Sequence, residues 1–410
     1  MAEWIECTLN DLGEIVGGAT PSTQREDYYG GDIPWITPKD LSSLQGRYIS
    51  RGERNITKNG LASCSAQLMP PKTVLFTSRA PIGYVAIAEQ TVCTNQGFKS
   101  IVPNAKVNPL FLYYLLVYNK ETIEAMGSGT TFKEVSGKAM RTVKVRIPSD
   151  MQSQIKIASL LDSIDSKIEA NAKLNDNLQQ QAMAVFKKWF VDNPDAISWE
   201  EGTFSDLIEK TISGDWGKDS PSGNNTEMVY CVRGADIPEV RAGNKGKMPT
   251  RYILSRNYAD KQLVDGDIVV EISGGSPTQS TGRAAAVSNA LLARYDKGMV
   301  CTNFCKALKP RAGYSMYVYY YWQYLYDRNI FFSYENGTTG IKNLDINGFI
   351  ETEPIIIAPE DLVEKFDAVC QTVFSKIYAN GMENEQLALI RDTLLPKLMS
   401  GEIDVSAVQL

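Results

Sequence analysis

The sequence repeats itself once, and this repeat constrains the fold more than any other feature. Five short segments recur in the same order, between 196 and 209 residues further along the chain. Chance similarity does not stay collinear over five segments, so we infer a duplication of about 200 residues. The matching segments are Gly18 with Gly214, 35–41 with 231–237, 92–99 with 300–307, 129–131 with 337–339, and 166–171 with 375–380.

The larger part of each copy has a pattern that predicts short strands and loops. Apolar segments such as 84–88 are brief and are separated by Gly, Pro, Asn and Asp. One helix is predicted in each copy. In the first it covers 108–126, where Asn108 is the cap and Pro109 takes the first helical position, and in the second it covers 313–329. Each copy is therefore predicted to form a mixed α/β globule.

A long helix is predicted after Pro148 and another after Pro359, because three or more helical turns follow without glycine or proline. Within each helix, one set of positions recurs at alternating spacings of four and three residues, which is the pattern of a coiled-coil seam. The seam positions are Ile164, Ile168, Asn171, Asn175, Leu178, Ala182, Val185 and Trp189 in the first helix, and Val373, Ile377, Asn380, Asn384, Leu387, Arg391, Leu394 and Leu398 in the second.

Two asparagines occupy the same seam positions in both helices. A buried asparagine destabilises a seam unless it meets a partner, and this requirement fixes the register. We therefore hypothesise that the helices pack antiparallel, with Asn171 and Asn175 facing Asn384 and Asn380. In the alternative, each helix packs on its own globule and the asparagines face water. Gly381 is expected to weaken the second helix locally.

The predicted fold class is α/β, of the α+β type. It has two repeated globules separated by two long helices that form an antiparallel coiled coil. The predicted domains are 1–148 and 193–358 for the globules, and 149–192 and 359–410 for the helices. A chain of 410 residues is too long for one ordinary core, which agrees with this division.

The charge of the chain is unevenly distributed. The net charge of −6, from 42 basic and 48 acidic residues, at first argues against a polyanionic partner. Residues 358–410 carry 4 basic and 9 acidic side chains, whereas residues 1–150 carry 16 and 14. Basic residues cluster at 39–58 and at 233–256, which are equivalent places in the repeat. A nucleic acid responds to such local patches and not to the total.

The chain has few of the residues on which catalysis usually depends. It has no histidine, which excludes His-based triads, His general bases and mixed Cys/His zinc sites. The seven scattered cysteines suit reduced, mostly buried thiols, and Cys301 and Cys305 have no second pair nearby to complete a metal site. Nucleotide-binding and amino-methyltransferase motifs are missing. We therefore predict no catalytic residue, no metal and no cofactor.

No segment suits a membrane. The longest strongly apolar run, 111–118, is far shorter than a bilayer span, and the first ten residues lack the features of a signal peptide. We therefore predict a cytoplasmic protein without membrane contact.

Several segments closely resemble the specificity subunit of type I restriction-modification systems. They are LFTSRAPIGYVAIA (75–88), TNQGFKSI (94–101), GTTFKEVSGKAM (129–140) and IASLLDSIDSKIEANAKLNDNLQQQAMAVFKKWFVD (157–192). The resemblance implies a non-enzymatic subunit in which each of two target-recognition domains reads one half of a bipartite, asymmetric site in double-stranded DNA. It also implies that the helices dock two modification subunits, which carry S-adenosylmethionine and methylate adenine. Restriction subunits, which use ATP, join that complex.

The two copies differ in their loops, since TNQG becomes TNFC and TTFKEVS becomes TTGIKNLD. Two different half-sites are therefore expected. Phosphate contacts position a protein on DNA and base contacts specify the sequence. The candidate DNA contacts are Lys39, Arg47, Arg51, Arg54, Arg79, Thr130, Thr131 and Lys133 in the first copy, and Arg233, Arg241, Lys245, Lys247, Arg251 and Lys342 in the second.

For any single one of these residues, a solvated charged face is an equally good interpretation. Ser276, Thr278 and Gln279, in a loop inserted at 274–282, have donors and acceptors that suit base edges, but a flexible surface loop describes them better. The tyrosines of 314–326 could stack on bases, yet aromatic residues so dense on a helix more often form a core.

Two other functions stay open at this stage. A non-DNA adaptor would use its duplicated globules to bind proteins, and salt-dependent, sequence-selective binding of duplex DNA by the assembled complex would argue against it. A self-sufficient DNA enzyme would methylate or cleave DNA as the purified chain alone.

Overall fold

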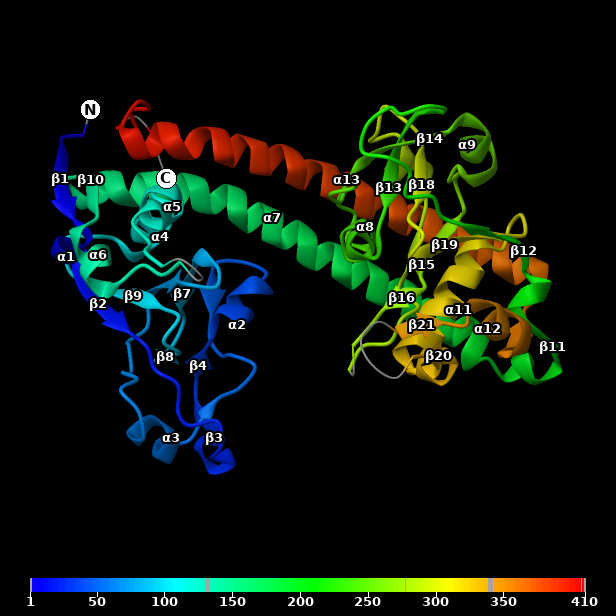
Figure 1. Cartoon of the computed structure of the whole chain (residues 1–410), viewed down its shortest axis with the longest axis horizontal. Helices are drawn as coiled ribbons and strands as arrows, with labels where there is room; N and C mark the ends of the chain where they lie inside the picture. Colours follow the sequence, from blue (N-terminus) through cyan, green and yellow to red (C-terminus); the bar gives the residue numbers. More distant parts are fainter. Residues whose placement is uncertain (1, 130–132, 277, 338–341, 407, 409–410) are drawn as a thin grey trace. The chain divides into compact units, whose positions relative to one another are not determined.

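The structure is a computed structural model that describes residues 2–129, 133–276, 278–337, 342–406 and 408. It divides into two compact units, Met1–Glu169 with Gln386–Leu410 and Ala170–Glu385. Each unit contains one mixed α/β globule and part of both long helices (Figure 1). The predicted domains instead give each helix a segment of its own, and those boundaries stay a prediction.

The first unit is built around a five-stranded sheet in the order β2-β9-β6-β7-β5. Two smaller pairs accompany it: β1 runs antiparallel to β10, and β4 runs parallel to β8. The strands are β1 (Trp4–Thr8), β2 (Gly13–Gly17), β3 (Tyr29–Ile33), β4 (Trp35–Ile36), β5 (Tyr48–Ile49), β6 (Val74–Ser78), β7 (Ile82–Ala88), β8 (Cys93–Thr94), β9 (Lys99–Pro103) and β10 (Lys144–Pro148). The short helices are α1 (Leu9–Leu12), α2 (Pro38–Ser42), α3 (Lys58–Ala62), α4 (Pro109–Tyr118), α5 (Lys120–Ala125) and α6 (Gly137–Thr142).

The second unit repeats this framework and adds to it. Its main sheet has the order β12-β19-β15-β17, β11 pairs with β22, and β13 runs parallel to β18. A small sheet, β16-β21-β20, and strand β14 are added. The strands are β11 (Glu200–Thr203), β12 (Ile208–Ser213), β13 (Asn225–Val232), β14 (Thr250–Leu254), β15 (Ile268–Glu271), β16 (Ser273–Gly274), β17 (Ala284–Ala286), β18 (Met299–Cys301), β19 (Cys305–Pro310), β20 (Glu335–Asn336), β21 (Lys342–Leu344) and β22 (Pro354–Ile357). The short helices are α8 (Ile237–Arg241), α9 (Ser255–Lys261), α10 (Asn289–Leu292), α11 (Ser315–Asp327) and α12 (Ile346–Thr352).

Hydrogen bonds align the two copies and correct one sequence match. The backbone N–H of Asn95 donates to Ile36 O at 3.0 Å, and that of Thr302 donates to Val232 O at 2.9 Å. Asn95 Oδ1 then accepts from the N–H two residues on, at 2.8 Å, as Thr302 Oγ1 does at 3.2 Å. Thr302 is therefore the counterpart of Asn95, and the identical letters of 92–99 and 300–307 are misaligned by one residue.

The predicted helix at 108–126 is two helices. Asn108 caps α4 as predicted, accepting from the N–H groups of Leu110 and Phe111. At Asn119 the backbone leaves the helical conformation (φ −89°, ψ 9°), and its side-chain amide donates to Leu115 O at 2.8 Å. An asparagine that bonds to the preceding turn competes with helix continuation, so α4 ends and α5 begins there.

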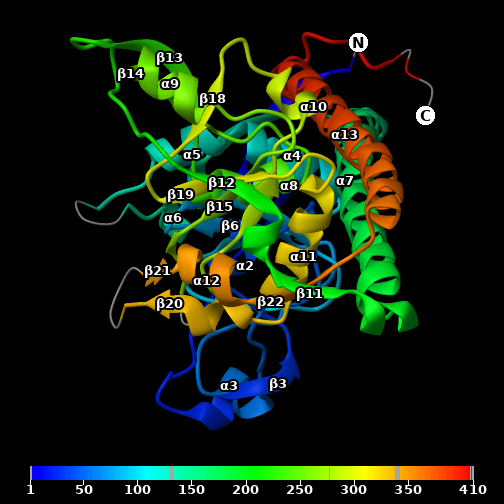
Figure 2. The ribbon, with the colours of Figure 1, turned by 90° about the vertical axis from the view of Figure 1, so that its right-hand side faces the viewer.

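Two long helices complete the fold, α7 (Met151–Phe186) and α13 (Glu360–Ser400). A π-helical turn, Lys187–Val191, follows α7. Within each unit the two helices lie side by side (Figures 1 and 2) and run antiparallel, since residue numbers fall along α13 as they rise along their α7 partners. Every predicted seam position is buried or half-buried. The coiled-coil seam is confirmed.

Each globule packs into a core with apolar residues of the two long helices. In the first unit, α4 and the main sheet pack with Ile157 and Leu161 of α7 and Leu398 of α13. In the second, the tyrosine-rich α11 packs with Phe186 and Phe366. Nine residues of α11, four tyrosines among them, are buried, which confirms the interpretation of this helix as core.

Candidate nucleic-acid interface and its anchors on the helices

The four seam asparagines pair as predicted, all within the second unit. Asn171 Nδ2 donates to Asn384 Oδ1 at 2.9 Å and to Glu383 Oε2 at 2.7 Å. Asn380 Nδ2 donates to Asn175 Oδ1 at 2.8 Å. Both Asn175 and Asn380 are at most 2% exposed. A shift of the helices would leave these buried amides without partners, so the pairs select one register.

Arg47 does not belong to the interface predicted for it. Its side chain is only 4% exposed, and its guanidinium lies 2.9 Å from Asp162 Oδ1 and 2.9 Å from Glu169 Oε1 on α7. It also donates to Ser166 Oγ at 2.9 Å. A guanidinium surrounded by these partners has no edge left for a phosphate. The DNA contact predicted for Arg47 is corrected: this residue fastens the loop after α2 to the helix.

Asp165 extends this charged cluster to the second helix. Its Oδ1 accepts from Arg391 Nη1 at 2.8 Å and its Oδ2 from Tyr114 Oη at 2.7 Å, and Arg47 Nη1 lies 3.8 Å away. Burial, and then the Asp165 charge, raise the pKa of Tyr114 well above its usual range. The phenol therefore stays protonated and keeps donating. The seam position Arg391, apolar in an ordinary coiled coil, is explained by this carboxylate.

The equivalent loop of the second globule meets α7 through side-chain amides, while Arg294 donates to Gly243 O at 2.6 Å and pairs with Glu385 of α13 at 2.5 Å. Asn175 Nδ2 donates to Ala242 O and to Ile377 O, each at 3.0 Å. Gln179 Nε2 donates to Arg241 O at 2.9 Å. A Cβ atom at Gly381 would lie 1.9 Å from Gly243 O, so only glycine admits this approach of loop to helix. Gly381 is needed for the contact.

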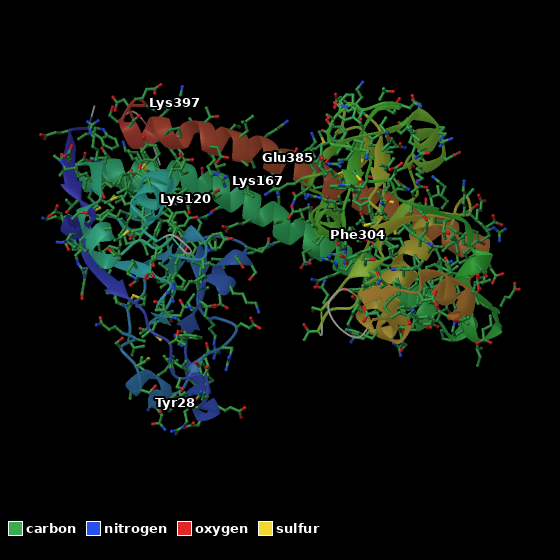
Figure 3. All side chains as sticks on the ribbon, in the orientation of Figure 1. Tyr28, Lys120, Lys167, Phe304, Glu385 and Lys397 are labelled. Atoms are coloured by element: carbon green, nitrogen blue, oxygen red, sulfur yellow. The ribbon has the colours of Figure 1, made fainter. Side chains whose placement is uncertain are left out.

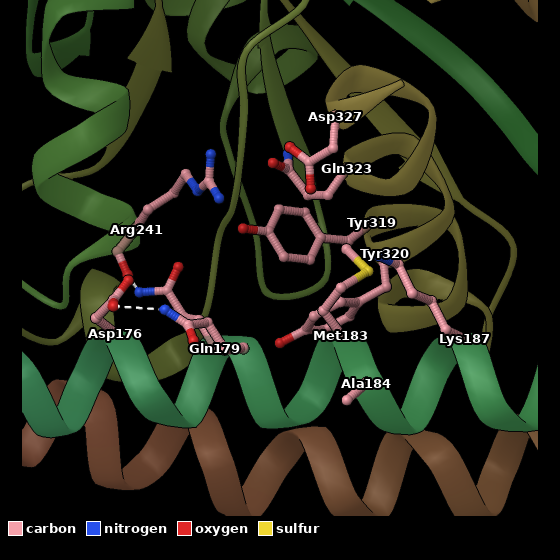
Figure 4. A pocket seen from close by; sticks show the side chains of 11 residues that line it. Asp176, Gln179, Met183, Ala184, Lys187, Arg241, Tyr319, Tyr320, Gln323 and Asp327 are labelled. Carbon is pink, nitrogen blue, oxygen red and sulfur yellow. Dashed lines mark hydrogen bonds between the residues drawn. The ribbon is translucent and has the colours of Figure 1, made fainter. Parts of the chain in front are cut away.

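The side chain of Arg241 also turns away from the predicted interface. It lines a hollow of about 370 Å³ with Tyr319, Tyr320 and Gln323, along the side of α7. Figure 4 shows the guanidinium pointing along this hollow towards Tyr319. Arg241 is half-buried there. Its predicted DNA contact is therefore dropped from the proposed interface.

Two further arginines of the second globule are held by their own fold. Arg251 is 6% exposed, donates to Trp216 O at 2.8 Å and pairs with Asp219, and its guanidinium lies 4.1 Å from the Trp216 ring centre. Its predicted DNA contact is corrected for the same reason as that of Arg47. Arg233 forms two hydrogen bonds to the Asp236 carboxylate, at 2.9 and 3.1 Å, and is about one-third exposed.

Two further predicted DNA contacts in the basic run 233–256 are Lys245 and Lys247. Lys245 Nζ lies 4.5 Å from the ring centre of Tyr295 and is half-buried, whereas Lys247 is exposed. Neither ammonium has a carboxylate partner among the described residues. Both therefore stay in the proposed interface.

In the first globule, the basic residues of 39–58 likewise differ in their exposure and in their partners. Lys39 is exposed but pairs with Glu53 at 2.6 Å. Arg51 is exposed, and its Nε and Nη2 would donate to the Asn55 amide oxygen, at 3.1 and 2.6 Å, with that amide turned so that its oxygen faces Arg51. The guanidinium carbon of the exposed Arg54 lies 4.1 Å from the ring centre of Tyr29. The sequence did not indicate that Tyr29 contacts Arg54, because only the fold brings these two residues together.

The GTT motif of each copy lies between two paired segments. Ser128 and Glu134 exchange backbone hydrogen bonds of 3.0 and 2.9 Å, and β20 pairs with β21. The predicted contacts Thr130 and Thr131 lie outside the described residues. Beside them Lys133 is exposed, Arg79 pairs with Glu134 at 3.5 Å, and Lys342 pairs with Glu335 at 2.7 Å.

The candidate base readers occupy the inserted loop after β16. Thr278 and Gln279 are exposed and Ser276 is half-buried, with its backbone N–H donating to Gln279 O at 2.7 Å. An aromatic residue that sequence reasoning missed is Phe304, labelled in Figure 3, which is 60% exposed. It is the counterpart of Gly97, since Phe304 O accepts from Ile272 N at 2.9 Å as Gly97 O does from Ser78 N at 2.7 Å.

Several known proteins are similar to this chain in sequence and in fold. Residues 1–180 match the family described as the type I restriction modification DNA specificity domain. The chain is 35% identical to the type I restriction enzyme MjaIX specificity subunit of Methanocaldococcus jannaschii, over 98% of this chain and 94% of that protein. The chain belongs to the type I restriction-modification specificity subunits.

Two other relatives agree with this assignment. The HindI specificity subunit of Haemophilus influenzae is 26% identical over 75% of this chain and 80% of its own length. The crystal structure of a type I restriction-modification S subunit from M. genitalium, 17% identical, has the same fold, with a TM-score of 0.54 over 97% of this chain and 96% of that one.

As a specificity subunit, the chain is a non-catalytic component that acts with the other subunits of its system on DNA. The seven cysteines are unpaired and five are buried, and burial raises the pKa of Cys231 to about 12. Such thiols are not activated nucleophiles. Among the described residues, no three acidic or cysteine side chains are grouped as metal ligands. Nor does any helix in the described ranges combine the length and hydropathy needed to cross a bilayer.

Proposed function

We propose that this specificity subunit reads a bipartite, asymmetric DNA site, with one globule for each half-site. The observation that carries the proposal is a repeated strand framework with different residues at equivalent loops. Phe304 occupies the place of Gly97, and Trp216 follows Gly214 where Thr20 follows Gly18. A shared scaffold with different exposed side chains suits two readers of different sequences.

Exposed cations support contact with the DNA backbone. Arg51, Arg54 and Lys133 in the first globule, and Lys247 in the second, are exposed and have no carboxylate partner among the described residues. Lys245 adds a half-buried cation. Such groups release counterions when they meet phosphates, which makes binding depend steeply on salt.

We propose that the two modification subunits dock on the helices. Helical surfaces in water are usually polar, yet four large apolar side chains of α7 and α13 are exposed: Leu174 by 41%, Met382 by 48%, Leu389 by 69% and Ile390 by 48%. Exposed apolar side chains of this kind are typical of protein contacts. In each unit, such side chains suit an apolar partner helix better than they suit DNA.

We also propose that the helices set the distance between the two half-sites. Helix α7 has 36 residues and α13 has 41, so at ~1.5 Å per residue they are ~54 and ~62 Å long. Half-sites on one face of DNA lie about one helical turn apart, ~34 Å. Paired rods of this length are long enough to hold two readers at such a separation.

The experiment inserts seven residues into each helix, between Glu169 and Ala170 and between Glu385 and Gln386. Methylated adenines are then mapped in the genomes of cells that carry the normal or the lengthened subunit with its modification subunits. The two half-site sequences should stay the same, and the spacer between them should lengthen by up to about three base pairs, because seven residues add ~10.5 Å to each helix. Insertion into one helix alone, as a control, should abolish methylation by breaking the seam.

If the lengthened subunit is active and the spacer is unchanged, the helices do not set the distance between the two half-sites. Failure of the normal complex to methylate or bind any duplex selectively would overturn DNA recognition as a whole. Such a result would favour an adaptor that binds proteins only.

A further inference from the structure

Arg54 of the first globule lies closely against an aromatic ring and has no carboxylate partner among the described residues. Its guanidinium carbon lies 4.1 Å from the ring centre of Tyr29, and the side chain is exposed. No described residue forms a hydrogen bond or an ion pair with its side chain. All five of its N–H donors are therefore unused while its position is restricted.

The ring under Arg54 is itself fixed. Tyr29 Oη donates to Pro21 O at 2.7 Å, and its ring meets the Trp35 ring edge-on with centres 5.9 Å apart. Trp35 is 6% exposed and its Nε1 donates to Ala19 O at 3.0 Å. The aromatic platform is thus continuous with the core of this part of the globule.

The backbone on both sides of Arg54 is also anchored. The N–H of Glu53 donates to Asp40 Oδ1 at 2.7 Å, and the carbonyl of Asn55 accepts from Gly30 N at 3.0 Å. Ile56, next along the chain, is fully buried. An arginine held in this way loses little further conformational entropy when it forms hydrogen bonds.

We infer that Arg54 is a base-reading residue of the first globule and that it recognises a guanine. This inference rests on the proposed function. A guanidinium that is held against a ring and keeps its fork free matches the two acceptors, O6 and N7, that guanine presents in the major groove. A phosphate contact needs charge but no fork, and Lys133 supplies charge of that kind.

The chain offers a matched control in Arg25. Its guanidinium carbon lies 4.8 Å from the ring centre of Tyr28, which is labelled in Figure 3, so it too rests on a tyrosine. Two of its donor atoms, however, are used by Asp27, at 2.8 Å from Nε and 2.9 Å from Nη2. Arg25 therefore shares the stacking of Arg54, but one edge of its guanidinium and its charge are already paired with a carboxylate.

The test uses the assembled complex with its modification subunits and its recognition site, once mapped from methylated adenines. Binding is measured for the normal subunit and for Arg54→Ala, Arg54→Lys and Arg25→Ala, on the cognate duplex and on duplexes with one base pair changed at a time. We expect Arg54→Ala to weaken cognate binding by roughly 10- to 100-fold and to remove discrimination at a single G·C pair. Arg54→Lys should not restore it, because an ammonium lacks the fork.

Replacing that guanine by 7-deazaguanine should weaken the normal complex and leave the Arg54→Ala complex unaffected, since only the former uses N7. Arg25→Ala should bind as the normal complex does. Equal weakening of all duplexes by Arg54→Ala, with a salt dependence reduced by about one phosphate contact, would overturn base reading. An unchanged affinity and specificity would overturn any contact by Arg54. A normal complex without sequence-selective binding would instead overturn the proposed function.

Discussion

The two globules meet the helices through equivalent loops but with different chemistry. In the first, Gly46 and Arg47 lie against α7, and the contact is made by a buried guanidinium and three carboxylates. In the second, Ala242 and Gly243, which lie 196 residues further on, meet α7 through a side-chain amide and α13 through a glycine contact, and the charged pair beside them is Arg294 with Glu385. After the duplication, both copies have kept the contact at the same place in the fold, but the side chains that form it differ.

This difference predicts that the two contacts fail in different ways. Removing one member of a buried charged cluster leaves the others unpaired, which costs several kcal/mol. In the second contact, the amides of Asn175 and Gln179 leave no unpaired charge when they are lost, and the charged pair beside them, Arg294 with Glu385, has a carboxylate that is 45% exposed. The close packing at Gly381, however, tolerates no added atom. The first contact is therefore sensitive to loss of charge, and the second to gain of volume.

The largest expected effect follows from replacing Arg47 by Met, which keeps the length of the side chain and removes its charge. Asp162, Asp165 and Glu169 then lose their shared cation. We expect a loss of about 3 kcal/mol in the free energy of unfolding. In thermal unfolding this is a drop of roughly 6–12 °C for a unit of this size. Hydrogen exchange should become faster around Tyr48 and Ile49.

Lys39→Met is the matched control, because Lys39 pairs with Glu53 at a site where both side chains are more than 60% exposed. Exposed pairs contribute at most about 1 kcal/mol, so this variant should unfold close to the normal temperature. Equal stability of the two variants would show that the charged cluster does not hold the loop to the helix.

A smaller effect is expected from Gly381→Ala in the second unit. In an ordinary helix interior this change stabilises by about 1 kcal/mol. Here the added Cβ would lie 1.9 Å from Gly243 O, so the loop must move away, and we expect a net loss of about 2 kcal/mol. Differential scanning calorimetry measures this loss. The counterpart of Gly381 in α7 is Ala172, and Ala172→Gly should also destabilise, by about 1 kcal/mol, from helix propensity alone. A stabilising Gly381→Ala would refute the close contact.

The repeat and the periodicity of the sequence predicted the arrangement of globules and long helices well. The repeat, the two long helices and the pairing of Asn171 with Asn384 all follow from periodicity and from the need of a buried amide for a partner. The sequence match of 92–99 with 300–307 placed Thr302 opposite Thr94, whereas the hydrogen bonds make it the counterpart of Asn95. Strand pairing, and not the similarity of a short segment, decides which residues are equivalent. The break at Asn119 depends on one side-chain hydrogen bond, which helical periodicity does not reveal.

The anchors on the helices could not be predicted, because their partners lie far apart in the sequence. Arg47 stands in a basic run and was predicted to touch DNA, yet the Glu169 carboxylate that pairs with it is 122 residues away. Gly381 was expected only to weaken its helix, since nothing in the sequence places Gly243 against it. The remaining DNA contacts stay predictions.

The smallest expected effect concerns the aspartate that closes each of these loops. Asp236, 2% exposed, accepts from Lys247 N at 3.0 Å and from the Arg233 side chain. Burial alone would raise the pKa of Asp236, but the hydrogen bonds from Arg233 and from the Lys247 N–H outweigh it and lower the pKa below its usual value. A lowered pKa in the folded state means that the stabilisation is complete above about pH 4 and is lost as the pH falls through the folded value.

We therefore expect Asp236→Asn to reduce the free energy of unfolding by about 1.5 kcal/mol at pH 7, since hydrogen bonds to a charged group are lost. The gap between this variant and the normal chain should narrow as the pH falls below about 4, because the carboxyl of the unfolded chain is protonated there, and it should close as the pH passes the lower pKa of the folded carboxyl. Denaturant unfolding between pH 3 and pH 7 measures it. The counterpart, Asp40, is more exposed and accepts only from Thr37 and from Glu53 N, so Asp40→Asn should cost less. A penalty for Asp236→Asn that does not change with pH would show that the neutral carboxyl holds the loop as well as the charged one does.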